Sequence, residues 1–407
     1  MNESPRTTPI RSADQRPFAG ILPDDRTAGT LVGRAWVGGV FPGPAIVSIR
    51  DDGVFDVTST YPTMSTLLDT ERPAEAARSA DGHRVCGVDE LLTNSLPGRR
   101  DDTQPRLLAP CDLQAIKAAG VTFAASMLER MIEEQARGDA SRAQALRAQV
   151  TALVGDRLSD VRPGSTKAAT LKALLQDKGL WSQYLEVGIG PDAEVFTKAP
   201  VLASVGCGDD IGILAESTWN NPEPEVVLAV NSRGDIVGAT LGNDVNLRDI
   251  EGRSALLLPK AKDNNASSAI GPFIRLFDDG FGLDDVRNET VHLHVTGTDG
   301  FEMRGINTMS SISRDPTELV RQTIAAHQYP DGFMLFLGTL FAPIDDRDEP
   351  GGGFTHKLGD IVTIQSARLG SLHNCVTHCE SAAPWKFGVR ALINNLNQRG
   401  LLTGNAI

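Results

Sequence analysis

The sequence predicts an α+β protein with more than one lobe, and three observations support this prediction. The chain has 407 residues, enough to bury a large hydrophobic core. Residues 21–108 alternate short apolar runs with Gly, Pro and Asp turns, which indicates a small β-rich N-terminal domain. Helical periods between residues 123 and 178 are followed by strand-like runs. The chain therefore combines strand-rich and helix-rich stretches.

The elements follow in order along the chain. Residues 1–20 are polar and contain proline, which predicts a mobile arm. The polar stretch 97–105 is typical of a linker into a second domain, residues 109–407. In that domain we expect helices at about 123–137, 141–158, 165–178 and 384–401, and strands at 113–119, 225–230, 236–241, 291–297, 331–337 and 361–364. Asp315 is expected to cap a further helix, since proline follows it directly.

Two acidic residues stand at the start of a predicted hairpin. Glu223 and Glu225 are separated by one residue, and side chains two apart on a strand leave the same face. The apolar runs on either side of the turn sequence at 232–235 have strand composition. If they pair about this turn, residue 223 lies opposite residue 243. This pairing puts Asp244, just beyond the second strand, beside the two glutamates.

Three like charges in one place repel each other, so they need a neutralising cation or must stay partly protonated. All-oxygen ligands without a nearby His or Cys favour a hard ion, Mg²⁺ first, with Mn²⁺ or Ca²⁺ as alternatives. Three carboxylates also leave open positions in an octahedron for a substrate. The alternative interpretation is an acidic, solvated edge around the hairpin.

The motif E-P-E followed by G-N-D-V-x-x-R-D resembles the fumarylacetoacetate hydrolase superfamily, whose E-x-E…D triad binds Mg²⁺ or Ca²⁺. The segment G-V-T-F-A-A-S-M-L-E at 120–129 is similar to that family's G-R-N-Y-x-x-H-x-x-E block. Glu129 matches the family's Glu, whereas Ser126 replaces a His that normally activates water for C–C bond hydrolysis. Without the resemblance, Glu129 reads as a solvated helix residue, because Arg130 and Glu133 follow it.

Further blocks of the same family follow in order. Lys198 stands in a sequence that resembles F-x-K-x-P, and Lys260 with Asp263 resembles the K-x-x-D pair. The distance from that pair to the following Gly-Pro is two residues longer here, which leaves Lys260 and Lys262 as alternatives. Thr339 matches the last residue of the T-G-T block, which reaches the substrate in that family.

The resemblance covers roughly residues 110–407 and implies a mixed β-roll or β-sandwich catalytic domain with a helical insertion at about 139–180. Within the superfamily the chain is most similar to dehydratases of 2-keto-3-deoxy-pentonates, of the xylonate or arabinonate type. The implied product is 2,5-dioxopentanoate, or α-ketoglutarate semialdehyde, in non-phosphorylative pentose catabolism. Glu129, Lys260 or Lys262 would take the C3 proton. The implied substrate-binding residues are Ser126, Lys198, Arg248, Asp263 and Thr339.

Two other functions stay open: a metal-dependent hydrolase of acylpyruvates or 2,4-diketo-3-deoxy sugar acids, and a non-catalytic sugar-acid binding protein. A net charge of −13 argues against nucleic acid or an anionic membrane as a partner. No run of about 18 apolar residues predicts a membrane span, and the first residues lack an apolar signal region, so we expect a cytoplasmic location. The family resemblance implies a homodimer or homotetramer.

Overall fold

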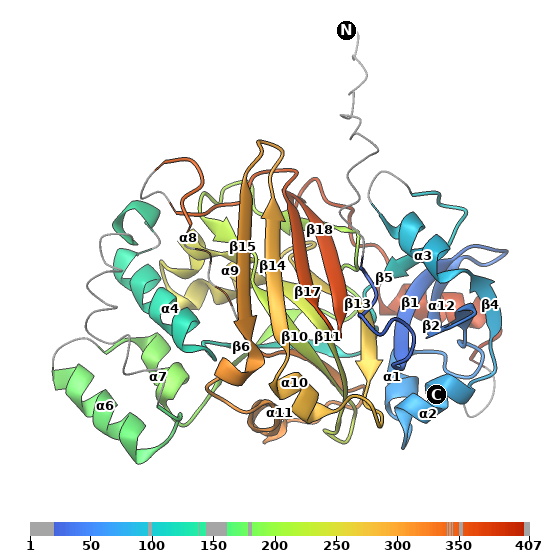
Figure 1. The fold of residues 1–407 in the computed structure, drawn as a ribbon, viewed down its shortest axis with the longest axis horizontal. Helices are drawn as coiled ribbons and strands as arrows, with labels where there is room; N and C mark the ends of the chain where they lie inside the picture. Colours follow the sequence, from blue (N-terminus) through green and yellow to red (C-terminus); the bar gives the residue numbers. More distant parts are fainter. Residues whose placement is uncertain are drawn as a thin grey trace, which may run out of the picture.

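The structure is a computed structural model that describes residues 20–96, 100–137, 139–143, 161–177, 181–339, 341, 343, 345–349 and 353–402 (Figure 1). The predicted arm at 1–20 lies outside the described residues up to residue 19, and most of the predicted helix 141–158 does as well. Part of the predicted linker, residues 97–99, is also outside them. No helix within the described residues is both long enough and apolar enough to cross a bilayer.

One sheet of 11 strands runs through the molecule in the order β4-β3-β2-β1-β13-β11-β10-β16-β6-β7, with β5 paired to β1. All its pairs are antiparallel except the parallel pair β16–β6. Its strands are β1 Leu31–Val37, β2 Gly43–Arg50, β3 Gly53–Asp56, β4 His83–Cys86, β5 Arg106–Leu108, β6 Ala115–Gly120, β7 Glu194–Ala199, β10 Pro224–Val230, β11 Ile236–Asp244, β13 Ser268–Leu276 and β16 Phe333–Phe336.

A second sheet packs against the middle of the first and closes the core between them (Figure 1). It has five strands in the order β15-β14-β17-β18-β8, which span Glu302–Thr308, Thr290–Thr296, Ile361–Ser366, Gly370–His378 and Asp210–Ile213. Alternate residues of β14 are buried, so its apolar side chains face the first sheet. A short pair, β9 Asn220–Asn221 with β12 Asn246–Leu247, lies beside the hairpin β10–β11. The layered sheets confirm the expected α+β fold.

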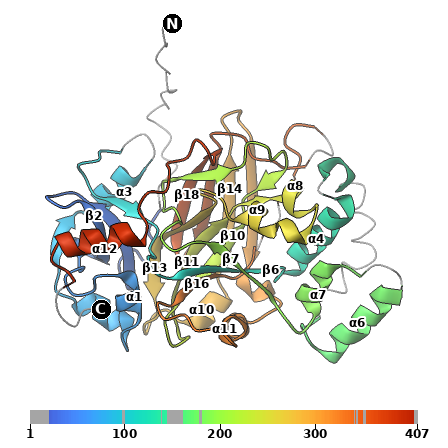
Figure 2. The ribbon, with the colours of Figure 1, turned by 180° about the vertical axis from the view of Figure 1, so that it is seen from behind.

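The N-terminal lobe consists of β1–β5 with the helices α1 Met64–Leu68, α2 Pro73–Ser79 and α3 Val88–Ser95. Its strands continue the large sheet, because β1 pairs with β13 and places Leu31 opposite Arg275. Helix α12, Val389–Gln398, crosses this lobe on the side seen in Figure 2. Asn395 Nδ2 donates to the carbonyl oxygen of Pro42 at 2.9 Å. The C-terminal helix therefore packs on the first strands of the chain.

The opposite end of the molecule is helical (Figure 1). Helix α4 packs with α6 and α7 around a separate apolar cluster. The remaining helices between β6 and β18 have nine residues or fewer and lie in connections between strands. The described helices from β6 to β18 are α4 Ala124–Ala136, α6 Thr166–Asp177, α7 Gln183–Ile189, α8 Arg248–Glu251, α9 Leu258–Lys262, α10 Leu283–Arg287, α11 Pro316–Ile324 and the 3₁₀ turns η1 Ala255–Leu257 and η2 Met309–Ser311. Asp315 caps α11 as predicted, because its carboxylate accepts from Thr317 N at 2.8 Å.

Candidate metal centre and the cavity beside it

The hairpin β10–β11 pairs one residue away from the predicted register. Pro224 lies opposite Asn243, and the N–H of Asp244 donates to the carbonyl oxygen of Glu223 at 3.1 Å. A β-bulge next to Ala229 causes the shift, because one strand contributes an extra residue there. A shift of one residue exchanges the two faces of a strand. The bulge therefore puts Asp244 on the face that carries both glutamates.

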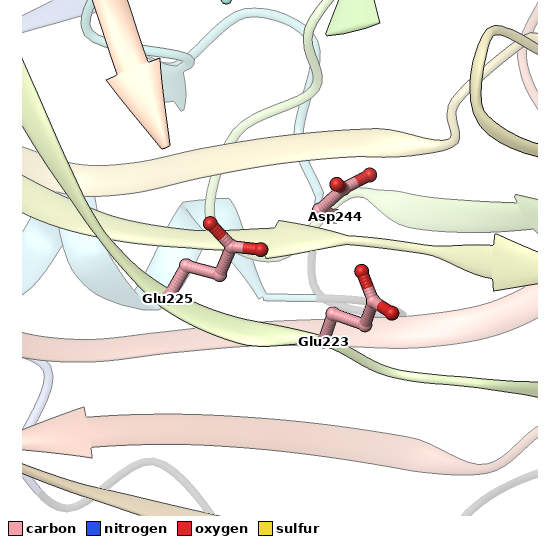
Figure 3. Close-up of side chains that lie close together, drawn as sticks. All are labelled: Glu223, Glu225 and Asp244. Carbon is pink, nitrogen blue, oxygen red and sulfur yellow. The ribbon is translucent and has the colours of Figure 1, made fainter. Parts of the chain in front are cut away.

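The three predicted carboxylates come together in one buried cluster (Figure 3). One carboxylate oxygen from each of Glu223, Glu225 and Asp244 lies within 4.8 Å of the others. Each residue is at most 3% exposed. The alternative interpretation of an acidic, solvated edge is therefore wrong.

Two lysines partly neutralise this cluster. Lys262 Nζ donates to Asp244 Oδ2 at 3.1 Å and also to Glu223. Lys198 Nζ lies 2.8 Å from Asp244 Oδ1. Burial opposes the ionisation of Asp244, but the two ammonium groups outweigh it and hold the pKa of that carboxyl below its usual value. Burial in turn lowers the pKa of Lys198.

Glu225 is less well compensated than the other two carboxylates. The backbone N–H of Gly338 donates to it at 2.7 Å. Burial, followed by repulsion from Asp244 and Glu223, raises the pKa of Glu225 well above its usual value. A divalent cation beside all three carboxylates would remove that repulsion and favour the ionised form. Three buried oxygen donors therefore fit a hard cation such as Mg²⁺.

Helix α4 forms one wall of a small cavity beside the cluster. Ser126, Glu129, Arg130 and Glu133 follow the helical repeat, so their side chains leave the same face. The cavity is lined by these four residues together with Asn221, Glu223, Arg248 and Thr339. Glu223 thus belongs both to the carboxylate cluster and to the lining of this cavity.

Arg248 connects the first turn of α8 to this face. Its Nε donates to Glu133 at 2.6 Å, and one of its terminal nitrogens donates to Glu129 Oε2 at 3.0 Å. Its guanidinium also lies over the Trp219 ring, 4.5 Å from the centroid. These contacts fix the direction of the Glu129 carboxylate at the wall of the cavity.

Arg130 is the main residue that the sequence did not identify. It bonds to Glu223 in the cluster, to Glu133 at 2.6 Å and to Glu251 at 2.9 Å. At Glu251 the effect of burial outweighs the attraction of Arg130, which is shared among several carboxylates, and raises the pKa of Glu251 to about 7. The helical spacing from Glu129 to Glu133 was visible in the sequence, but a solvated face has the same spacing.

The other predicted site residues lie as follows. Ser126 donates its hydroxyl to the carbonyl oxygen of Phe123 at 2.9 Å, and Thr339 bonds to the carbonyl oxygen of Phe341 at 2.9 Å. Lys260 and Asp263 are exposed and do not reach the cluster.

The ammonium of Lys260 instead lies 2.6 Å from Glu216 at the surface. Residues two apart on a helix point about 200° apart, so Lys260 leaves α9 on the side opposite Lys262. Lys262 is therefore the lysine of this pair that the fold brings to the carboxylates.

No protein-family model matches the sequence. Over 336 residues, which are 82% of this chain and 95% of the relative, it is 28% identical to a probable 2-keto-3-deoxyxylonate dehydratase from Haloferax volcanii. Over 179 residues, 44% of this chain and 57% of the relative, it is 30% identical to 2-dehydro-3-deoxy-D-arabinonate dehydratase from Saccharolobus solfataricus.

Two solved structures have a similar fold. One is a 2-keto-3-deoxy-D-arabinonate dehydratase in complex with magnesium and 2,5-dioxopentanoate, with a TM-score of 0.58 and 21% identity over 86% of this chain and 99% of that chain. The other is fumarylacetoacetate hydrolase from Exiguobacterium antarcticum, with a TM-score of 0.51 and 15% identity over 86% of this chain and 99% of that chain. At these identities the likeness shows a common fold.

Proposed function

We propose that the chain is a member of the fumarylacetoacetate hydrolase superfamily and a Mg²⁺-dependent dehydratase of a 2-keto-3-deoxy-pentonate, of the xylonate or arabinonate type. The proposed product is 2,5-dioxopentanoate, a compound bound in one of the structural neighbours, and the proposed role is a step of non-phosphorylative pentose catabolism. The sequence relatives named as dehydratases support the reaction class. We propose further that the protein is a homodimer or homotetramer, which its molar mass in solution tests.

The observation that carries this proposal is the buried carboxylate cluster beside a cavity that is also lined by two arginines and by two further carboxylates, Glu129 and Glu133. Glu223, Glu225 and Asp244 supply the three acidic ligands for a hard divalent cation. A Mg²⁺ ion held there would bind the carboxylate and keto oxygen of a 2-keto acid and stabilise the negative charge that develops as C3 loses a proton. Such a cluster, buried and open to a cavity, suits a small anionic substrate.

Glu129 is the residue that we assign as the base. It lines the cavity, and its carboxylate is oriented by Arg248 at 3.0 Å. Glu129 takes the C3 proton, the C4 hydroxyl leaves as water with a proton returned from that carboxyl, and a C3=C4 double bond forms. Tautomerisation towards C5 then gives the aldehyde. Lys262, an ammonium beside the cluster, adds positive charge where the enolate forms.

A substrate assay tests the proposal. The purified protein is incubated with 2-keto-3-deoxy-D-xylonate or 2-keto-3-deoxy-D-arabinonate and Mg²⁺, and 2,5-dioxopentanoate is measured. We expect EDTA to abolish product formation, and Glu225→Ala to abolish both turnover and Mg²⁺ binding by calorimetry. Glu129→Gln should keep Mg²⁺ binding but lower kcat by about 10²- to 10⁴-fold. Metal-dependent turnover by Glu225→Ala would refute the metal assignment.

The hydrolase is the second candidate, and the same preparation distinguishes it. It needs an activated water, and Ser126 stands where the resembled family has the histidine that activates it; the described residues that line the cavity include no histidine in its place. Pyruvate released from an acylpyruvate, without dehydration of the pentonate, would favour the hydrolase. Tight binding of either compound with no product would favour the sugar-acid binding protein.

A further inference from the structure

A second cavity lies where the N-terminal lobe meets the catalytic strands, and we call it the junction cavity. It has a volume of about 420 Å³, and none of its lining residues lines the cavity beside the metal cluster. Strands β1 and β5 form one side of it, and the segment 383–387 that leads into α12 forms another. Its volume is within the range of small-molecule sites.

The lining of the junction cavity is basic, although the chain as a whole is acidic. Arg34, Arg100, Arg106 and Lys386 line it, against two carboxylates, Asp209 and Asp210. The net charge of the chain is −13. A local excess of positive charge in a concave surface attracts small anions.

Two of these guanidinium groups, Arg34 and Arg106, have no carboxylate of the described residues within ion-pair distance. Arg34 is 5% exposed and donates to the backbone carbonyls of Ala109 and Cys111, at 3.2 and 2.5 Å. Arg106 is half-buried, and its guanidinium lies 5.9 Å from the centroid of the Trp36 ring. Within the described residues its side chain makes no hydrogen bond or ion pair, and Asp209 and Asp102 attract it only over a longer distance. Arg100, by contrast, is paired with Asp209.

A half-buried guanidinium without a direct ion pair keeps its N–H donors available for a ligand. Its planar set of N–H donors matches the oxygens of a phosphate or carboxylate group. An anion that enters the junction cavity would therefore satisfy Arg106 and add to the weak compensation of Arg34.

Three aromatic side chains, Trp36, Trp385 and Phe387, also line the junction cavity. Trp36 and Phe387 meet edge to face, with centroids 5.5 Å apart. Trp385 is 47% exposed, and its indole Nε1 donates to the carbonyl oxygen of Phe387 at 3.1 Å. This bond fixes the ring while leaving much of its surface open. A planar heteroaromatic ring can stack on such a surface.

We propose that the junction cavity binds a nucleotide, with its phosphate at Arg106 and its base against Trp385. The two required groups, an anion and a flat ring, are combined in one small molecule of suitable size. This site is separate from the proposed active site and does not depend on the reaction catalysed there.

Calorimetric titration tests this proposal on the full chain in EDTA, with AMP, GMP, CMP and UMP as ligands. Adenosine and inorganic phosphate test each half of the ligand alone. We expect saturable binding of at least one nucleotide, and at least about tenfold weaker binding of adenosine and of phosphate. Arg106→Gln should weaken nucleotide binding by at least about tenfold. The matched control Arg72→Gln, on an exposed side chain of the same lobe, should bind as the wild type does.

Trp385→Leu gives a second variant at an exposed position, in case Arg106→Gln does not fold. Glu225→Ala should still bind the nucleotide, because it alters the other cavity. The proposal is overturned if none of the nucleotides binds, if phosphate binds as tightly as every nucleotide, or if Arg106→Gln and Trp385→Leu both leave binding unchanged. Loss of nucleotide binding in Glu225→Ala would also overturn it.

Discussion

Lys262 and Lys260 are two positions apart, yet the fold gives them opposite surroundings. The side chain of Lys262 is 3% exposed and contacts Glu223 and Asp244, whereas that of Lys260 is 48% exposed. The sequence could narrow the choice to these two lysines, because Lys260 fits the K-x-x-D spacing whereas Lys262 fits the distance to the following Gly-Pro. It could not choose between them, since the answer depends on where the short helix α9 begins.

A pair of variants tests the role of Lys262. We expect Lys262→Met to lower kcat/KM by about 10²- to 10³-fold, because it removes the positive charge beside the forming enolate. The metal-free variant should also lose about 3 kcal/mol of unfolding free energy, since Glu223 and Asp244 lose a buried partner. Lys260→Met is the matched control and should change neither quantity. Equal losses in the two variants would exclude a special role for Lys262.

Glu251 makes stability depend on pH. Its pKa is raised to about 7, by burial first, so the native state holds a proton that the unfolded chain has already released. Between its usual pKa and about 7, the native state binds more protons, and the unfolding free energy therefore falls as pH rises. In Glu251→Gln the unfolding free energy should fall less over this pH range, by up to about 3 kcal/mol, because the variant lacks the titrating carboxyl.

Urea unfolding in EDTA across this pH range measures the effect. Other buried carboxyls titrate in both proteins, so the difference between wild type and Glu251→Gln is the quantity of interest. Glu75→Gln, on a side chain that is 59% exposed, is the control and should follow the wild type. A Glu251→Gln curve parallel to the wild type over the whole range would contradict the prediction.

At the scale of elements, the hairpin could be predicted from its composition, but its bulge could not. Strand-forming residues on both sides of a turn indicate pairing, whereas one extra residue in a strand leaves no local signal. That single residue decides which face Asp244 occupies. Helix α4 shows a related limit. The helical spacing from Ser126 to Glu133 can be recognised in the sequence, but it does not show whether that face of the helix points to solvent or to a cavity.

Substitution of Gly242 tests how tightly the hairpin is packed next to the carboxylate cluster. Gly242 lies opposite Glu225, and a Cβ there would lie 2.3 Å from the Phe336 ring and 2.6 Å from a Val227 methyl group. Gly242→Ala should therefore destabilise the fold by about 1–3 kcal/mol. Because Glu225 moves with its strand, Mg²⁺ binding should weaken by about tenfold.

Thermal unfolding and calorimetry with Mg²⁺ give both quantities. Gly282→Ala is the control, because no atom lies within 4 Å of a Cβ built at that position. It should leave Mg²⁺ affinity unchanged. Unchanged affinity in Gly242→Ala as well would show that the strand position does not limit the metal site.

At the scale of the whole molecule, the two parts of the chain share one sheet. Strand β1 adds to the edge of β13, and Arg275 on β13 pairs with Asp25 at 2.6 Å. The sequence indicated a small β-rich N-terminal region, but strand composition alone does not tell which strand of another region it will join. The predicted boundary between two domains at residue 108 therefore stays a proposal. The hydrogen bonds between β1 and β13 connect the two sides of that boundary.

We predict that the protein unfolds as one cooperative unit. Loss of the N-terminal lobe would expose the edge of β13 and leave Arg275 without its carboxylate, so residues 109–407 alone should not fold stably. Tryptophan fluorescence and far-ultraviolet circular dichroism should give coincident urea transitions. Two separated transitions, or a folded 109–407 fragment, would contradict this prediction.

Helix α12 also limits how early in synthesis the N-terminal lobe can finish folding. Asn395 and Pro42, which it joins at 2.9 Å, stand 353 positions apart in the chain. The ribosome must therefore translate nearly the whole chain before α12 can pack on the N-terminal strands. Until α12 is made, the surface around Pro42 that it covers stays exposed to solvent. During this period chaperones can bind that surface, and a chain that stops before α12 is prone to aggregate.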